Sequence, residues 1–311
     1  MEDERRRERV GMAAAAASAV LFGTSYVATA FALRSFSPVG VGLWRGALAA
    51  ALLALILVLS RGRLGALPRD RVRLGRLLVL GVVGGPAFIV AMNLAVALAG
   101  AAIASFVAGL YAVLAAVLAP LVLRERLPPQ ATIGFVVALV GTLLLAGLAP
   151  SGSVVAGTAA GLAAALAYAL YLVLSRRWTR DDGLSGPAIS LATLVCSAVV
   201  LLGVELVREP AAIVPARIRP DAALGLLWLV VMVSLIAQLL VVASVRRIAA
   251  RRSSAFLLLN PPSATLVAWL LLGEALGPVE LVGGALVLLG IAVASGLLGP
   301  SSTGAAAGPD G

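Results

Sequence analysis

The sequence predicts an all-α polytopic membrane protein with ten transmembrane helices, arranged as two inverted-topology repeats of five helices each. The first supporting observation is composition: 61% of the 311 residues are hydrophobic and only 12% are charged, which is more apolar surface than a soluble domain can bury. The second is a series of apolar runs of about 20 residues, each long enough for a hydrocarbon core about 30 Å thick. The third is an internal repeat.

The repeat aligns Leu110–Gly147 with Leu259–Gly296 without a gap. In both copies an apolar run ends in a glutamate, a leucine and a proline, and a glycine-spaced apolar run follows. A shared register of glutamate, proline and three spaced glycines favours an internal duplication over chance. The matched pairs of rarer residues are Glu125 with Glu274, Pro129 with Pro278, Gly134 with Gly283, Gly141 with Gly290 and Gly147 with Gly296.

Ten membrane spans follow from the apolar runs, and loop charges orient them. The predicted spans are 11–33, 39–59, 74–99, 101–123, 130–149, 154–175, 185–206, 221–245, 253–273 and 278–299. With a cytoplasmic N-terminus, most of the 24 basic residues, all of them arginines, fall in cytoplasmic loops, as the positive-inside rule requires. Five spans per copy is an odd number, so the second copy enters the membrane upside down. Glu125 is then expected to face the cytoplasm and Glu274 the outside.

These spans predict four segments. Residues 1–10 form a cytoplasmic N-terminal segment, 11–149 the first repeat, 154–299 the second repeat, and 300–311 a tail too poor in large apolar groups to fold. We expect a multi-pass protein of the cell inner membrane with both termini in the cytoplasm. The run after Arg5, Arg6, Arg7 and Arg9 is interpreted as an uncleaved first helix because its length is that of a span.

Several function classes are disfavoured by missing residues. The chain has no histidine, which removes the commonest general base and metal ligand. It has no nucleotide-binding loop and no paired intramembrane carboxylates, so we expect neither an enzyme nor a built-in primary pump, and no cofactor. The net charge of +10 is explained by loop arginines rather than by nucleic acid binding. Cys196 is the only cysteine, so it forms no internal disulfide.

Arg45 is the only strongly charged residue well within a predicted span. A buried arginine is costly in hydrocarbon unless it pairs, faces water or reaches the headgroups. Two interpretations remain open here. Arg45 contacts an anion or carboxylate in a cavity, or it snorkels to the headgroups or binds helix carbonyls.

Other polar residues recur at similar places in the two copies. Phe22, Ser25 and Thr29 have the spacing of Tyr168, Tyr171 and Ser175, Asn93 corresponds to Gln238, and Tyr111 corresponds to Asn260. Amides and hydroxyls in hydrocarbon need partners or water, so these pairs indicate a wet surface between the repeats. The candidate substrate-binding residues are Phe22, Ser25, Tyr26, Arg45, Asn93, Tyr111, Tyr168, Gln238, Asn260 and Trp269.

Three further features have competing interpretations. Pro261 and Pro262 must break or kink a helix, and Asn260 beside them either binds ligand or joins helices. Glu125 and Glu274 lie at span ends and favour a structural role over proton coupling, while Glu205 is expected to be solvated. The glycines of the repeat are expected to allow close helix packing.

The ordered set of motifs resembles the drug/metabolite transporter superfamily, specifically its members with two tandem EamA-type domains. The resemblance covers about 12–298, essentially the whole chain. It implies ten helices around a central cavity, formed mainly by the first four helices of each repeat, and export of small metabolites by alternating access. One departure is Tyr111-Ala112, where a glutamate–proline pair is common in the family. The motifs are Phe22-Gly23-Thr24-Ser25, Trp44-Arg45, Asn93-Leu94-Ala95, Leu123-Arg124-Glu125-Arg126-Leu127 and Leu272-Gly273-Glu274-Ala275-Leu276.

We therefore expect a secondary transporter, an exporter of a small neutral or zwitterionic metabolite such as an amino acid. The alternative is efflux of multiple drugs or cationic compounds. The first span has no acid, unlike that of single-repeat multidrug exporters, so proton coupling, exchange with a counter-substrate and facilitated diffusion all stay open. The partners expected are the small-molecule substrate and the lipid bilayer, with the protein a monomer or a homodimer.

Overall fold

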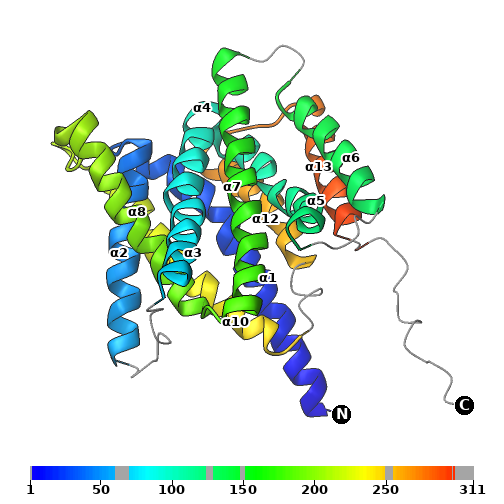
Figure 1. The fold of residues 1–311 in the computed structure, drawn as a ribbon. Coiled ribbons are helices and arrows are strands. Elements are labelled where there is room, and N and C mark those ends of the chain that lie inside the picture. The colour runs from blue at the N-terminus through cyan, green and yellow to red at the C-terminus, as the bar shows by residue number, and fades with distance from the viewer. Residues whose placement is uncertain are drawn as a thin grey trace, which may run out of the picture.

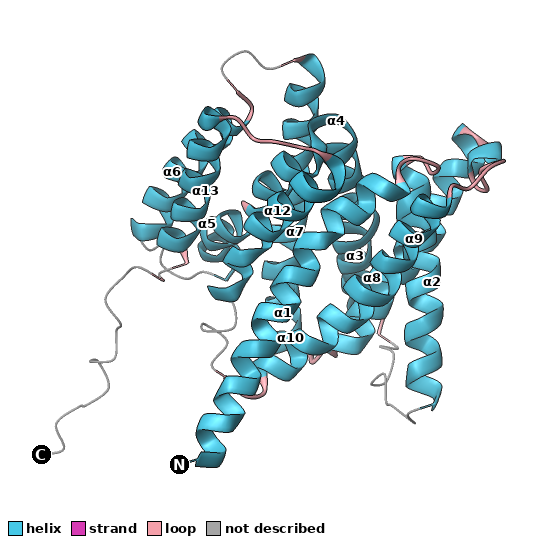
Figure 2. Cartoon of the chain, turned by 180° about the vertical axis from the view of Figure 1, so that it is seen from behind, coloured by secondary structure: helices cyan, strands magenta, loops and turns pink. Residues whose placement is uncertain are grey.

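The structure is a computed structural model that describes residues 2–59, 70–123, 129–147, 151–248, 255–295 and 297. Throughout these ranges the chain forms helices joined by turns, without a strand (Figures 1 and 2). The all-α expectation is therefore confirmed for the described chain. Glu125, with its neighbours Arg124 and Arg126, and the tail 300–311 lie outside the described residues.

Seven helical elements lie in the described part of the first half of the chain. They are α1 (Glu2–Ala32), α2 (Pro38–Leu59), α3 (Arg71–Val82), the π-helical η1 (Val83–Ala87), α4 (Phe88–Gly109), α5 (Tyr111–Leu123) and α6 (Pro129–Leu145). Helix α1 begins at Glu2, before the predicted span that starts at residue 11. The side chain of Asp70 caps α3 by accepting from the amides of Val72 and Arg73.

The second half continues with α7 (Gly152–Asp182), α8 (Gly186–Arg208), the short η2 (Pro210–Ala212) and α9 (Pro220–Trp228). It then contains the π-helical η3 (Leu229–Ala237), α10 (Gln238–Val245), the 3-10 turn η4 (Phe256–Leu259), α12 (Asn260–Leu272) and α13 (Pro278–Ala294). Ser151 and Ser185 cap α7 and α8. Helix α7 ends at Gly183, whose φ of 67° suits glycine best.

Length and composition suit these helices to a membrane. Among the described residues six stretches are long and apolar enough to cross one: Arg6–Ala32, Pro38–Leu59, Arg71–Val122, Gly152–Asp182, Gly186–Arg208 and Pro220–Val245. Pro129–Leu145, Phe256–Leu272 and Pro278–Ala294 are shorter apolar helices. Leucines and valines on many of them are exposed on the outside, as expected where lipid rather than water surrounds the protein. The chain is an all-helical polytopic membrane protein.

Helices from the two halves of the chain interlock. Helix α1 packs against α9, α10 and α12 of the second half, and α7 packs against α3, α4 and α5 of the first half. Helix α2 packs against α8, and α6 against α13. The pair α6 and α13 forms one edge of the bundle (Figure 1). Each half therefore completes its packing only in the presence of the other.

Each of the two interlocking helices, α1 and α7, is joined near its C-terminal end by an ion pair to a helix of the other half. Arg34, just after α1, contacts Asp221 at the start of α9, with Nη1 2.6 Å from Oδ2. Arg76, in α3, contacts Asp182 at the end of α7. The two pairs join equivalent elements of the two halves with the positions of acid and base exchanged.

Helices α6 and α13 run antiparallel and touch through glycines. A Cβ added to Gly134 would lie 2.5 Å from the carbonyl oxygen of Gly290, and one added to Gly141 would lie 2.6 Å from that of Gly283. An early residue of each helix thus meets a late residue of the other. The expectation that these glycines permit close packing is confirmed, because any side chain there would enter the backbone of the partner helix.

Helix α4 is interrupted at Gly100, which has φ 84° and ψ 166°. Such a break leaves backbone N–H groups that lipid cannot satisfy. The carboxylate of Glu274 accepts hydrogen bonds from the amides of Ala101 (3.1 Å) and Ala102 (3.0 Å). A carboxylate from the second half therefore caps the helical segment that restarts after Gly100, which supports the structural role expected of Glu274.

We predict that Gly141→Leu separates α6 from α13 and lowers the yield of folded protein. The single cysteine, Cys196, is 9% exposed, so the temperature at which it reacts with a maleimide dye reports unfolding. Gly203→Leu is the matched control because no atom lies within 4 Å of a Cβ at Gly203. Equal midpoint temperatures of Cys196 labelling for Gly141→Leu and Gly203→Leu would contradict the close packing of α6 on α13.

We predict that Glu274→Ala destabilises the protein by about 2 kcal/mol or more, since two hydrogen bonds to a charged acceptor are lost. Unfolding in mixed detergent micelles measures the free energy. Glu209→Ala, which removes an exposed acid after α8, should change it by less than about 0.5 kcal/mol. A wild-type midpoint for Glu274→Ala would show that the cap contributes nothing.

Candidate functional site

Arg45 lies on α2 and is partly buried. Its Nε donates a hydrogen bond to Oγ of Ser234, in η3, at 3.1 Å. Tyr26 and Tyr168 are close enough to interact with its guanidinium electrostatically. Within the described chain no carboxylate pairs with it. The guanidinium is thus bonded to a side chain of the other half rather than to its own helix, and its charge has no anionic partner among the residues that the structure describes.

Tyr168 of α7 is the centre of an aromatic cluster beside Arg45. The ring of Phe88, at the start of α4, lies 4.7 Å from it between centroids. The ring of Tyr111, at the start of α5, meets it edge-on at 4.9 Å and 85°. Tyr171, one helical turn further along α7, stacks on it at 5.6 Å. Offset and edge-to-face contacts of this kind fix the orientation of each ring.

Tyr26, on α1, adds a fourth tyrosine hydroxyl to this group, after those of Tyr111, Tyr168 and Tyr171. Its side chain is 6% exposed and packs among small residues of α4, α7 and α12, including Ala104, Ala164 and Ala264. Tyr168 and Tyr111 are both its electrostatic neighbours. Four tyrosines and one guanidinium therefore converge from α1, α2, α5 and α7, at the junction of the two halves of the chain.

A break between α3 and α4 creates the space for these rings. A Cβ on Gly84 would lie 2.3 Å from Cδ2 of Tyr171, so only glycine leaves room for that ring. The next residue, Gly85, has non-helical φ and ψ of −97° and −107°, and Pro86 follows. Proline lacks the amide hydrogen that would continue the helix. The break lets Phe88 approach Tyr168 from a different direction than a straight helix would.

Three predicted site residues are engaged in packing or in hydrogen bonds to the backbone. Oγ of Ser25 donates to the carbonyl oxygen of Phe22 at 2.6 Å. The ring of Phe22 packs beside Trp44 against a buried cluster of α1, α2 and η3. Nδ2 of the fully buried Asn93 donates to the carbonyl oxygen of Pro38 at 2.8 Å, which ties α4 to the start of α2. These contacts brace the site, while Oδ1 of Asn93 is buried without a hydrogen-bond partner among the described residues.

Asn260 marks the expected helix break. The 3-10 turn η4 ends before it, and Pro261 and Pro262 lie in the first turn of α12, where the missing amide hydrogens cost little. A Cβ on Gly23 would lie 2.7 Å from the carbonyl oxygen of Asn260, so α1 crosses closely here. Oδ1 of Asn260 is buried and has no partner within the described chain. It can accept a hydrogen bond from a solute or from water.

Gln238 and Trp269 lie away from the cluster. Gln238, at the start of α10, is exposed. Trp269 is 56% exposed on the same side of α12 as Leu266 and Leu270. An outward row of large apolar side chains is typical of a lipid-facing helix. The structure does not bring these two residues to Arg45.

The expectation that Glu205 is solvated is wrong. Its side chain is 3% exposed, and Oε1 accepts a hydrogen bond from Oγ of Ser37 at 2.5 Å. Ser37 in turn accepts from the amide of Gly40 in the first turn of α2. Glu205 lies near the end of α8, and the close packing of α2 on α8 covers it. Its position late in an apolar run suggested exposure because the sequence does not show which helix covers that end.

Two residues that the sequence did not place at the site contact it, Phe88 and Ser234, whereas Tyr171 was already matched with Ser25 on the surface between the repeats. The signal for Phe88 was the Gly84-Gly85-Pro86 sequence, which predicts a break but not which ring follows it. Ser234 is a lone hydroxyl in an apolar run, and only the π-helical geometry of η3 orients it toward Arg45. Among the described residues, His, Cys, Asp and Glu form no group able to hold a metal ion.

The chain is similar to known proteins over most of its length. The profile of the EamA-like transporter family matches residues 9–147 and again 155–296. An uncharacterized transporter of Bacillus subtilis (strain 168), YyaM, is 24% identical over 289 residues, which cover 90% of this chain and 91% of that protein. A solved structure titled only "Crystal structure of protein" covers 94% of this chain and 97% of its own, with a TM-score of 0.61 and 20% identity. That likeness shows a shared fold.

We predict that Tyr168→Ala destabilises the protein by about 2 kcal/mol or more, because three neighbouring rings lose their contact. Tyr168→Phe keeps the ring and should cost about 1 kcal/mol or less. Reaction of Cys196 with a maleimide dye during heating compares the variants. Trp269→Ala, which removes a largely exposed ring, is the control. A cost for Phe equal to that for Ala would show that the hydroxyl, not the ring contact, stabilises the cluster.

Proposed function

Because this chain belongs to the EamA-like transporter family, we propose that it exports a small neutral or zwitterionic metabolite, such as an amino acid, by alternating access. The family makes it a transporter. Substrate class, direction and mechanism are our proposal. The observation that carries it is Arg45, a cation between the two halves of the chain without an acidic partner in the described structure.

Arg45 is assigned the contact with a substrate carboxylate. A guanidinium offers a planar set of N–H donors that matches the two oxygens of a carboxylate. Partial burial strengthens such a contact, because water competes less for the donors. Ser234 holds Nε at 3.1 Å, so the guanidinium is oriented before a ligand arrives.

The tyrosines are assigned the contacts with those parts of the substrate other than its carboxylate. Tyr26, Tyr111 and Tyr168 supply hydroxyls that either donate or accept, together with apolar rings. Asn260 supplies an acceptor, Oδ1, suited to an ammonium group. A site of this kind favours a compact solute with one carboxylate and a modest apolar side chain. Phe22, Ser25 and Asn93 support the site through packing and backbone contacts.

The alternating-access mechanism rests on two inverted repeats. Three observations support the inversion. Helices α6 and α13 are antiparallel, and their contacts pair Gly134 with Gly290 and Gly141 with Gly283, which exchange under the repeat register of the sequence. The packing of α1 is mirrored by that of α7, and the two ion pairs recur with exchanged charges. Transporters with this symmetry bind substrate at the repeat junction.

Efflux of cationic compounds is the alternative function, and the positive charge of Arg45 disfavours it. A positive charge in a low-dielectric site repels another cation strongly. No acid accompanies Arg45 among the described residues, so nothing there would offset this repulsion.

The experiment has two stages. Untargeted comparison of metabolites released by overexpressing and deletion strains identifies the substrate, and counterflow in proteoliposomes then measures it. Arg45→Ala is expected to reduce transport about tenfold or more, since a charge-assisted hydrogen bond contributes about 1.5–3 kcal/mol. Arg45→Lys should retain part of the activity, because it keeps the charge and loses the planar fork.

Arg180→Ala is the control, because that arginine is exposed at the end of α7, with 77% of its side-chain surface accessible. Wild-type counterflow in a folded Arg45→Ala protein would remove Arg45 from the mechanism. Export of cationic dyes in place of carboxylate-bearing metabolites would establish the alternative.

A further inference from the structure

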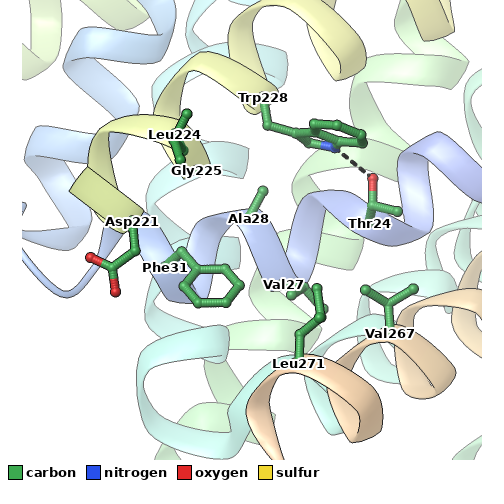
Figure 3. A pocket seen from close by; sticks show the side chains of 10 residues that line it. All are labelled: Thr24, Val27, Ala28, Phe31, Asp221, Leu224, Gly225, Trp228, Val267 and Leu271. Carbon is green, nitrogen blue, oxygen red and sulfur yellow. Dashed lines mark hydrogen bonds between the residues drawn. The ribbon is translucent and has the colours of Figure 1, made fainter. Parts of the chain in front are cut away.

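An apolar cavity of about 400 Å³ lies between α1, α9 and α12, apart from the tyrosine cluster. Figure 3 shows its walls, with Asp221 at one end and Trp228 beside Thr24 at the other. Val27, Ala28, Phe31, Leu224, Gly225, Val267 and Leu271 complete the lining. Leu224 and Leu271 are 66% and 60% exposed, so the cavity opens sideways toward the surrounding hydrocarbon.

The inner end of the cavity offers nothing to a polar solute. Nε1 of Trp228 donates to Oγ1 of Thr24 at 2.8 Å (Figure 3), and Oγ1 of Thr24 donates to the carbonyl oxygen of Leu21 at 2.7 Å. The two polar groups of the wall therefore satisfy each other or the backbone. An unpaired polar ligand would lose its hydration there without compensation. The occupant of this part must be hydrocarbon.

The outer end carries a concentration of positive charge. Asp221 pairs with both Arg34 and Arg219: Nη1 of Arg34 lies 2.6 Å from Oδ2, and Nε of Arg219 lies 3.0 Å from Oδ1. Two arginines and one aspartate leave a net charge of +1. Each guanidinium has five N–H donors, of which Arg34 uses one and Arg219 two on this carboxylate. The remaining donors suit an anionic oxygen.

Phe31 joins the two ends. The guanidinium of Arg34 lies over its ring, 4.4 Å from the centroid, while the same ring lines the cavity. The charged group is thus held at the mouth of the apolar space. From Thr24 to Ala32, helix α1 rises about 12 Å, which is most of the roughly 15 Å depth of one hydrocarbon leaflet.

We propose that this cavity binds one glycerophospholipid of the surrounding bilayer, with an acyl chain between α1, α9 and α12 and its phosphate on Arg34 and Arg219. The length and the apolar walls of the cavity match an acyl chain, and the positive charge at its mouth matches a phosphate. The site is separate from the proposed substrate site, so the lipid is a bound structural partner and not the transported solute. The proposal does not depend on the substrate class.

Native mass spectrometry of the full chain in detergent tests the proposal. Dioleoyl phosphatidylglycerol, dioleoyl phosphatidylcholine and dioleoylglycerol are titrated in turn. They share acyl chains, and the last lacks phosphate. We expect one tightly retained phospholipid, with dioleoylglycerol bound at least about tenfold more weakly. Equal retention of all three would overturn the phosphate assignment and with it the proposal.

Two sets of variants test the acyl-chain contact and the phosphate contact separately. Leu224→Trp fills the cavity and should weaken phosphatidylglycerol binding about tenfold or more, while Leu270→Trp, equally exposed on α12 but outside the lining, should not. Arg34→Gln with Arg219→Gln should abolish the preference for phosphate. Cys196 reactivity confirms that each variant is folded.

Equal binding by Leu224→Trp and Leu270→Trp would place the lipid elsewhere and refute the site. Displacement of phosphatidylglycerol by millimolar inorganic phosphate would also overturn the proposal, because a lipid anchored by its chain should resist a free anion.

Discussion

Backbone hydrogen bonding within lipid is the constraint on which this structure depends. A helix that breaks inside an apolar bundle exposes amide hydrogens that hydrocarbon cannot accept. The break at Gly100 meets this constraint through the carboxylate of Glu274, which comes from the other half of the chain. Since the acceptor and the break lie far apart in sequence, neither half can satisfy its own backbone there. Helices α1 and α7 likewise pack mainly against helices of the opposite half of the chain.

The breaks in the helices also locate the candidate site. At Gly84–Pro86 the chain loses helical geometry and gains room for Tyr171, and at Asn260 the 3-10 turn brings a backbone carbonyl against Gly23. Tyr171 lies against Gly84 at the first irregularity, and α1, which carries Tyr26, crosses the second at Gly23. Irregular backbone at membrane depth is tolerated where protein or water covers it, and polar side chains gather at the same places because they need the same cover.

The family adds a functional meaning to this geometry that the fold alone does not supply. The EamA-like transporter family establishes transport for the chain, while the chemistry of recognition has to be argued from side chains. A site formed by a guanidinium and tyrosines differs chemically from a drug-binding site lined by acidic residues.

Sequence alone predicted an all-α membrane fold and the helix break at Asn260, whereas the candidate site stays a prediction. Apolar length and the proline and glycine positions are local signals, and local signals suffice for Asn260 and for the glycines of α6 and α13. The candidate residues Tyr26, Arg45, Tyr111 and Tyr168 come together because their faces point inward at the junction.

The failures concern side chains whose surroundings come from another helix. Glu205 was misjudged because its cover is α2 and the hydroxyl of Ser37. Gln238 and Trp269 were included for their chemistry, but they face outward, and Ser234 was missed since a π-helical turn sets its direction. A sequence states what a residue is, whereas rotation about a helix axis decides what it touches.

The glycine contacts of α6 and α13 have a mechanical consequence. With carbonyl oxygens this close to the opposite backbone, a slide of one residue or a small rotation would bring a leucine or valine into the partner helix. The two helices therefore move as one rigid pair, and a conformational change elsewhere in the bundle has to leave this pair intact.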